Sequence, residues 1–354
     1  MRAACLSDWR GGWVDEGAPA PYAATAAAVR KEIIPTQADS QRQMCGSPRH
    51  RSWQWRWRSS DARCPFATPT REQLCARLAG KRIVLYGDSL THQFFASLAS
   101  LAGNATRAPV PRECWRLRHL KCVSVCGGTA LVCNRHHFAL ALDELPPSLP
   151  PNCSVRARVA PLNATFAPRC LARFDLVVLS AFSHWVGMDG ALNVQTCLRE
   201  GGAAMTNGAA ARAAVEYTAA LYDAQMRRDA AFLSRLPSAS RRVLFRTSPP
   251  GYPPPDALRP DTRGGRPPVY LAPSRDLAWV DAYARRESSP FNHHLFRRFN
   301  AIARAAYDAH GLPVMDVERP MLHRVDGHMD PLHYCLPGPP DFYSYVLWNF
   351  ALGQ

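Results

Sequence analysis

Short apolar runs alternate with longer segments of helical periodicity along most of this chain. Residues 83–86 form an apolar run typical of a buried strand, and Gly87 follows it where the backbone can turn sharply. Beyond this glycine, apolar side chains recur at helical spacing at Leu90, Phe94, Leu98 and Leu101. The pattern therefore predicts a strand, a tight turn and a helix in direct succession.

The same alternation continues towards the end of the sequence. Further strands are predicted at residues 174–180, 242–246 and 314–317. Further helices are predicted at residues 209–236, 293–309 and 340–350. Because strands and helices alternate, we expect an α/β fold with a parallel sheet flanked by helices. Residues 249–290 are rich in Pro and Arg and predict a long surface insertion.

Tryptophans alternate with polar residues ahead of this region. Trp53, Trp55 and Trp57 would share one face of a strand, because side chains alternate between faces with a period of two. Three bulky rings on one face favour packing onto the rest of the protein, with glycan stacking as the alternative. We therefore divide the chain into a Trp- and Cys-rich N-terminal segment, residues 1–80, and a main domain, residues 81–354.

Cysteine usage indicates an oxidising compartment. The chain has 354 residues, 47% of them hydrophobic, and 12 are cysteines, an even and high number. Sequons for N-glycosylation at Asn104, Asn152 and Asn163 are compatible with such a compartment. We expect Cys5 to pair with Cys64.

A second group of cysteines lies in the middle of the chain. The group consists of Cys114, Cys122, Cys126 and Cys133. Cys122 and Cys126 are close enough to form half of a zinc site, but no second such pair completes it. Disulfides are the favoured interpretation, with zinc as the alternative.

The formal net charge of +15 leaves two interpretations open. It can reflect a general affinity for anionic polymers, such as acidic polysaccharides, or an Arg-rich solvated surface without a specific partner. The arginines are scattered and no nucleic-acid-binding motif is present, so we expect no nucleic-acid partner.

The sequence predicts neither a membrane anchor nor a signal peptide. No segment is long and apolar enough to cross a bilayer, and residues 1–10 lack an apolar signal region. This disagrees with the cysteine pattern, so we expect that the natural N-terminus is truncated here.

Two stretches carry candidate chemistry. Ser89 follows the strand at 83–86 and opens a helix, a position that suits a nucleophile, although Asp88 or Ser89 could instead simply cap the helix. Asp330 and His333 are three residues apart, so the carboxylate can orient the imidazole as a base for a serine. Either residue could alternatively cap the helix that follows.

Four blocks of sequence resemble one known family, the plant trichome-birefringence-like polysaccharide O-acetyltransferases in the PC-esterase branch of the SGNH/GDSL hydrolases. The blocks are Trp53-Gln54-Trp55-Arg56-Trp57-Arg58 leading to Cys64, Gly80-Lys81-Arg82 leading to Gly87-Asp88-Ser89, Val243-Leu244-Phe245-Arg246-Thr247-Ser248-Pro249, and Asp330-x-x-His333-Tyr334-Cys335-Leu336-Pro337-Gly338-x-Pro340-Asp341. The resemblance implies an SGNH-like catalytic domain with the N-terminal segment folded onto it.

This chain departs from the family pattern in two places. The third block is one residue shorter than in the family. Aligned on the pair His184-Trp185, Ala181 stands where the family has an Asn that helps to form the oxyanion hole. We expect Ser180, Ser183 or backbone N–H groups to replace that donor, with Gly87 and Asp88 supporting the nucleophile motif.

Three further side chains are candidate substrate contacts. They are His184, Trp185 and Arg246. The alternatives are a packed loop for the first two and a structural ion pair for Arg246.

The resemblance implies a two-step acyl transfer. Ser89 would take an acetyl group from a donor co-substrate, with His333 as the base and Asp330 as its orienting carboxylate, and a polysaccharide hydroxyl would then accept the acetyl group. No metal or bound cofactor is expected, and the expected location is the secretory pathway, in the Golgi lumen. The alternatives are an acetylesterase that uses water as acceptor and a non-catalytic glycan-binding relative.

Overall fold

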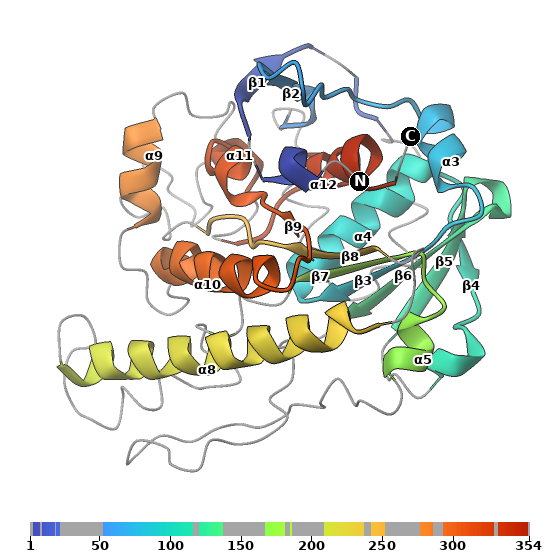
Figure 1. Cartoon of the computed structure of the whole chain (residues 1–354). Helices are drawn as coiled ribbons and strands as arrows, with labels where there is room; N and C mark the ends of the chain where they lie inside the picture. The colour runs from blue at the N-terminus through green and yellow to red at the C-terminus, as the bar shows by residue number, and fades with distance from the viewer. Residues whose placement is uncertain are drawn as a thin grey trace, which may run out of the picture.

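The computed structural model describes residues 3–7, 9–17, 19–21, 52–115, 120–136, 167–180, 185, 209–236, 242–251, 277–285, 293–328 and 332–352. These residues form an α/β fold built on a mostly parallel sheet of seven strands in the order β4-β5-β6-β3-β7-β8-β9 (Figure 1). The strands are β3 (Arg82–Gly87), β4 (Thr106–Ala108), β5 (Leu120–Val125), β6 (Ala130–His136), β7 (Leu176–Ser180), β8 (Arg242–Arg246) and β9 (Val314–Met315).

Strand β3 lies in the middle of the sheet. It pairs in parallel with β6 on one side and with β7 on the other, and β7, β8 and β9 continue in parallel. The four strands predicted from apolar runs are thus all present and parallel, although the second and fourth are shorter than predicted. Strands β4, β5 and β6, joined by antiparallel pairing, were not predicted, because their cysteine-bearing stretch lacks a long apolar run.

Helices cover both faces of the sheet. Helix α4 (Ser89–Ala102) and helix α12 (Asp341–Val346), which continues as one π turn at Leu347–Ala351, lie on one face. Helix α8 (Ala209–Ser234) and helix α10 (Phe296–Asp308) lie together on the other (Figure 1). The shorter helices are α3 (Arg71–Leu78), α5 (Ala167–Leu171), α9 (Leu277–Ala284) and α11 (Glu318–Leu322), with 3₁₀ turns at Ala3–Leu6, Ser52–Gln54, Arg112–Cys114, Cys126–Gly128, His293–Leu295 and Val325–Gly327.

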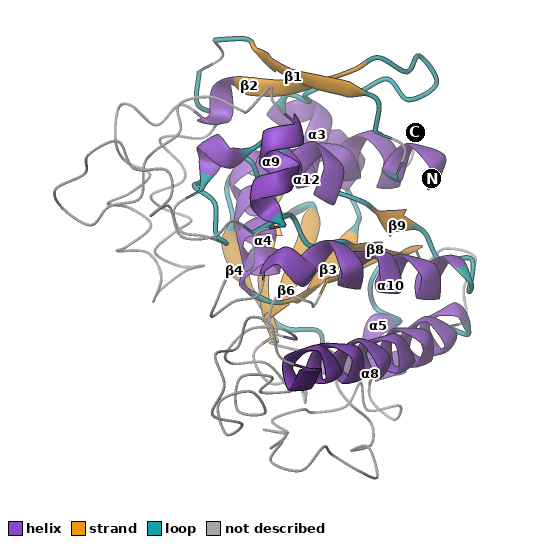
Figure 2. Cartoon of the chain, turned by 90° about the vertical axis from the view of Figure 1, so that its left-hand side faces the viewer, coloured by secondary structure: helices purple, strands orange, loops and turns teal. Residues whose placement is uncertain are grey.

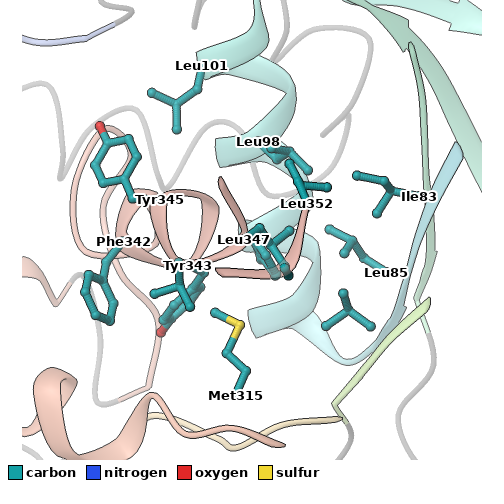
Figure 3. Packing of buried hydrophobic residues seen from close by; sticks show 14 of the residues in the cluster. Ile83, Leu85, Leu98, Leu101, Met315, Phe342, Tyr343, Tyr345, Leu347 and Leu352 are labelled. Atoms are coloured by element: carbon teal, nitrogen blue, oxygen red, sulfur yellow. The ribbon is translucent and has the colours of Figure 1, made fainter. Parts of the chain in front are cut away.

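The sheet separates two apolar cores. Alternate residues of β3 point to opposite faces, so Ile83 and Leu85 join the core beneath α4 and α12, whereas Val84 and Tyr86 join the core against α8 and α10. Figure 3 shows this first core, to which Leu85 of β3, Leu98 of α4 and Leu347 of the π turn all belong. Helix α4 is buried along its whole length, which fixes its first residue relative to the end of β3.

The N-terminal segment packs on the C-terminal helix. Strands β1 (Gly11–Asp15) and β2 (Trp55–Ser59) form a separate antiparallel pair, seen at the top of Figure 2. The rings of Trp57 and Trp13 lie 6.2 Å and 5.2 Å from that of Phe342 in α12, and Trp57 is 4% exposed. Packing therefore accounts for Trp57, as predicted. Trp53 lies in a 3₁₀ turn rather than in the predicted strand.

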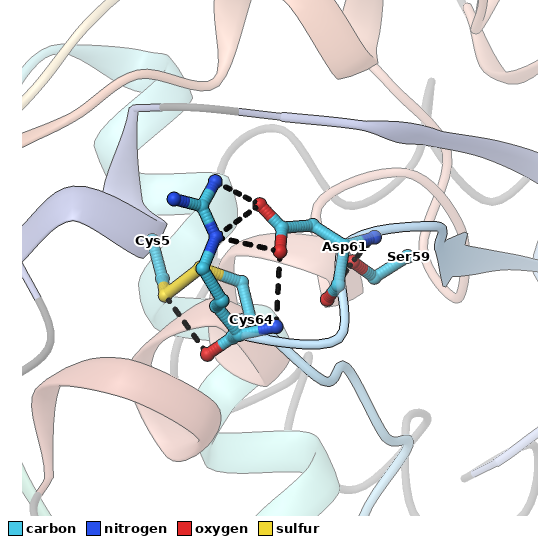
Figure 4. Close-up of a disulfide and its surroundings, with 5 residues drawn as sticks. Cys5, Ser59, Asp61 and Cys64 are labelled. Atoms are coloured by element: carbon cyan, nitrogen blue, oxygen red, sulfur yellow. Dashed lines mark hydrogen bonds and ion pairs between the residues drawn. A yellow bond between two sulfur atoms is a disulfide. The ribbon is translucent and has the colours of Figure 1, made fainter.

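Disulfides connect these elements. The predicted Cys5–Cys64 bond is confirmed and joins the N-terminal turn to the chain after β2 (Figure 4). The other described pairs are Cys75–Cys126, Cys114–Cys170 and Cys122–Cys133, and Cys335 is also disulfide-bonded. The zinc alternative for Cys122 and Cys126 is wrong, because both sulfurs are in disulfides. Four described disulfides indicate an oxidising, secretory or extracellular environment.

No helix in the described part of the chain has the length and apolar character needed to cross a bilayer. Of the predicted insertion at 249–290, the structure describes residues 249–251 and residues 277–285, which include helix α9; the rest lies outside the described residues.

Candidate active site

The turn between β3 and α4 presents Ser89 at the carboxyl edge of the sheet. Asp88 is the N-cap of α4: its Oδ1 accepts hydrogen bonds from the N–H groups of Leu90 at 3.1 Å and Thr91 at 3.3 Å. The capping alternative is thus correct for Asp88. It leaves Ser89 as the first helical residue, 6% exposed, with its side chain available for chemistry.

His333 reaches this serine from the other end of the chain. Its Nε2 lies 2.7 Å from Ser89 Oγ, although 244 residues separate the two in sequence. The serine hydroxyl can donate to Nε2 when the ring proton is on Nδ1, and this is the arrangement that a general base needs. The structure therefore brings together the predicted nucleophile and the predicted base.

Gly87 is required where β3 ends. A Cβ built on Gly87 would lie 1.7 Å from the backbone oxygen of Ser180 and 2.4 Å from Thr91 Oγ1. No other residue fits without moving β3 or β7. The predicted supporting role of Gly87 thus has a steric basis, namely the close approach of two strands beside the nucleophile.

The backbone at the start of α4 supplies a candidate oxyanion donor. Asp88 engages the N–H groups of Leu90 and Thr91 through its carboxylate and that of His92 through its carbonyl. Among the described residues, the Ser89 N–H is therefore the donor of the first turn that is left to face an oxyanion.

Ser180 ends β7 directly beside Gly87. It is 1% exposed, and its hydroxyl has no hydrogen-bond partner within the described residues. Its proposed part in the oxyanion hole stays a prediction.

Arg246 lies behind the nucleophile turn, at the end of β8. It has no exposed surface; its Nη2 donates to Thr91 Oγ1 at 3.3 Å, and its guanidinium lies 5.0 Å from the ring centroid of Tyr343. Burial lowers the pKa of Arg246, while Tyr343 and Asp88 act in the opposite direction. In this structure Arg246 supports the start of α4, and a contact with substrate stays a prediction.

Of the remaining predicted site residues, one is buried in the described part of the chain and the others lie outside it. Trp185 has no exposed surface and its ring lies 5.1 Å from that of Tyr222, as the packing alternative predicts. Ala181, His184 and Asp330 lie outside the described residues, so the roles expected for them stay predictions. Within the described part of the chain, no cluster of three or more His, Cys, Asp or Glu side chains forms a metal site.

Two residues of α4 were not singled out from the sequence. Thr91 Oγ1 lies between Arg246 and the Ser180 carbonyl oxygen, 3.5 Å from the latter. Gln93 contacts the backbone of Tyr334, the residue after His333. The available signal was the four-residue spacing of Gln93 from Ser89, which places both on one helix face.

Comparisons with known proteins add little to this geometry. No protein-family model matches the chain, and no curated protein matches it. Among solved structures, a match was found to LAE5, an alpha/beta hydrolase enzyme from the metagenome of Lake Arreo, Spain. The two chains are 10% identical with a TM-score of 0.37, and the match covers 78% of this chain and 98% of that one. Function is therefore argued from the geometry of the site and from the sequence blocks, and not from this match.

Proposed function

We propose that this protein is a serine-dependent acyltransferase that moves acetyl groups to polysaccharide hydroxyls. The observation that carries the proposal is the 2.7 Å contact between Ser89 Oγ and His333 Nε2 at the carboxyl edge of a parallel sheet. The resemblance of the four sequence blocks to the trichome-birefringence-like O-acetyltransferases supports acetyl as the group and a glycan as the acceptor.

The first half-reaction acylates the serine. Ser89 Oγ attacks the acetyl carbonyl carbon of the donor while its proton passes to His333 Nε2. The Ser89 N–H stabilises the negative oxygen of the tetrahedral intermediate. When the bond between the acetyl carbon and the donor breaks, His333 returns the proton to the leaving group.

The second half-reaction releases the acetyl group. A sugar hydroxyl transfers its proton to His333 Nε2 and attacks the acyl-serine carbonyl carbon. Collapse of the intermediate breaks the bond to Ser89 Oγ, which takes the proton back from His333. In the proposal, Asp330 orients the imidazole through both steps. Water in place of the sugar would make the protein an acetylesterase, the second candidate.

A non-catalytic glycan-binding role is the third candidate. Its support is Ala181, which stands where the resembling family has an oxyanion-hole Asn. Loss of such a donor lowers kcat by about 10²–10³-fold in other hydrolases. The contact between Ser89 and His333 favours the enzymatic candidates, because a binding protein has no need for it.

The deciding experiment follows protein mass and sugar mass together. The disulfide-bonded protein is incubated with an activated acetyl ester and cell-wall oligosaccharides, with Ser89→Ala as the control. We expect an acetyl adduct on Ser89 that moves to the sugar.

The three candidates give different results. An adduct that is lost only to water identifies an esterase. No adduct, together with no labelling by a fluorophosphonate, contradicts both enzymatic candidates and favours the binding role. Under each of the three candidate functions, Ser89→Ala should bind glycan as tightly as the unchanged protein does.

A further inference from the structure

Gln93 forms two hydrogen bonds with the backbone of Tyr334, the residue that follows His333. Its Nε2 donates to the Tyr334 carbonyl oxygen at 2.6 Å, and its Oε1 accepts from the Tyr334 N–H at 3.1 Å. Both partners are backbone groups, so they fix the orientation of the amide: the donor must face the carbonyl and the acceptor must face the N–H. Gln93 is 1% exposed, so water cannot replace either bond.

This contact links the two halves of the candidate site. Gln93 is four residues after Ser89 on α4 and therefore extends from the same face of the helix. The Tyr334 N–H belongs to the peptide that follows His333, so holding it restrains the backbone of His333. One rigid helix thus carries both the nucleophile and the group that fixes the base.

We propose that Gln93 is a positioning residue that holds the His333 imidazole within reach of Ser89. This inference rests on the proposed function. Proton transfer between Ser89 and His333 requires a donor–acceptor distance near 3 Å, and displacing reacting groups by about 1 Å costs about 10²-fold in rate. The role of Gln93 is to keep that distance short.

Other bonds also hold Tyr334 and Cys335, so we expect this part of the chain to keep its fold without Gln93. The Tyr334 hydroxyl donates to the Pro250 carbonyl at 3.3 Å, the Cys335 N–H donates to the Gly327 carbonyl at 2.8 Å, and Cys335 is in a disulfide. Loss of Gln93 should therefore affect the precision of His333 more than the stability of the protein.

The chain contains a matched control for this contact. Asn349 makes the same pair of bonds with the backbone of Ala67: its Oδ1 accepts from the N–H at 3.1 Å and its Nδ2 donates to the carbonyl at 2.8 Å. Its Nδ2 also donates to the Tyr345 carbonyl at 2.8 Å, so removing this side chain costs at least as many bonds as removing Gln93. This pair joins the N-terminal segment to the C-terminal π turn and includes neither Ser89 nor His333. A variant of Asn349 therefore measures the effect of removing such a contact away from the candidate site.

The test compares Gln93→Met with Asn349→Leu, both near-isosteric and unable to form the two bonds. We measure the second-order rate of Ser89 labelling by a fluorophosphonate, kcat and KM for an activated acetyl ester, and Tm. Each variant should lower Tm by about 2–5 °C. Gln93→Met alone should slow labelling and lower kcat by about 10–100-fold, with KM within threefold of the unchanged protein.

Two results overturn the proposal. One is labelling of Gln93→Met at the rate of the unchanged protein, and the other is equal slowing in both variants, which would indicate a purely structural role. If Gln93→Met does not fold, Gln93→Asn replaces it, because its amide is one methylene too short to reach both groups. If the unchanged protein is not labelled, the proposed function fails, which is a separate outcome.

Discussion

Gly87 and Ser180 end adjacent parallel strands so close together that a Cβ on Gly87 would lie 1.7 Å from the Ser180 backbone oxygen. The turn that presents Ser89 is therefore specified by the sheet as well as by the helix that follows. Thr91 also leaves no room for a side chain at Gly87, because its Oγ1 would be 2.4 Å from the same Cβ.

Gly87→Ala should disable the site. The added methyl must displace the Ser180 carbonyl, which shifts β3 and separates Ser89 from His333, at a cost of about 1–3 kcal/mol in stability. The measurement is fluorophosphonate labelling of Ser89 together with Tm. Gly12→Ala is the control, because a Cβ at Gly12 meets nothing within 4 Å. If Ser89 of Gly87→Ala is labelled at the normal rate, β3 and β7 can move apart without separating Ser89 from His333, and the prediction is wrong.

Arg246→Lys distinguishes support of the site from substrate binding. Because Arg246 is fully buried and bonded to Thr91, the shorter ammonium should leave polar groups unpaired and lower the free energy of unfolding by about 1–3 kcal/mol. We expect kcat to fall with KM for the glycan nearly unchanged, as measured by steady-state kinetics and denaturant unfolding. A rise in KM without loss of stability would instead assign Arg246 to substrate.

Glu318 should make stability depend on pH. Burial raises its pKa above the ordinary value of 4.5, while a hydrogen bond from Asn300 and the positive charge of Arg297 act against the shift. A carboxyl group whose pKa is raised by folding lowers stability at pH above the folded value, and this loss disappears as pH falls below the unfolded value.

Glu318→Gln should therefore be more stable than the unchanged protein at pH 7, with the difference shrinking towards pH 4. Gln can still accept the hydrogen bond from Asn300. Urea unfolding midpoints of both proteins across this range provide the measurement. A difference that grows on acidification would mean that the ionised form of Glu318 is the stabilised one.

Removing the Cys75–Cys126 disulfide should destabilise the protein substantially. The bond joins α3 to the turn between β5 and β6 across 51 residues, and the loss of a cross-link of that length corresponds to roughly 4 kcal/mol in the chain-entropy description. The double variant Cys75→Ala/Cys126→Ala is compared with the oxidised protein by denaturant unfolding. An unchanged denaturant midpoint would contradict the prediction, because it would mean that removing the disulfide adds little conformational entropy to the unfolded chain.

Asn104 should carry an N-linked glycan when the chain passes through a secretory pathway. It is exposed between α4 and β4 in the sequon Asn104-Ala105-Thr106, and its φ of 51° is a conformation that Asn tolerates well. Thr106→Ala removes the sequon but keeps Asn104. Endoglycosidase treatment followed by mass spectrometry of the Asn104 peptide should show a shift for the unchanged protein only; an unmodified peptide there contradicts the prediction.

The alternating strands and helices of the main domain could be predicted from the amino-acid sequence. Apolar runs and helical spacing are local signals, and they predicted β3, β7, β8 and β9 together with the helices that cover them. Local chemistry also marked Ser89, because a strand, a glycine and a helix start occur in succession. His333 was marked by its spacing from Asp330 and by the resemblance of its block to a known family.

Features that depend on contacts between distant residues became evident only in the folded protein. The pairing of β4, β5 and β6, the partners of Cys75 and Cys126, and the burial of Arg246 all follow from packing that leaves no local periodicity. The role of Gln93 is of the same kind: its partner is 241 positions away, so no window of sequence contains both. Local pattern specifies elements, whereas the distance between Ser89 and His333 is set by the shared core that holds those elements together.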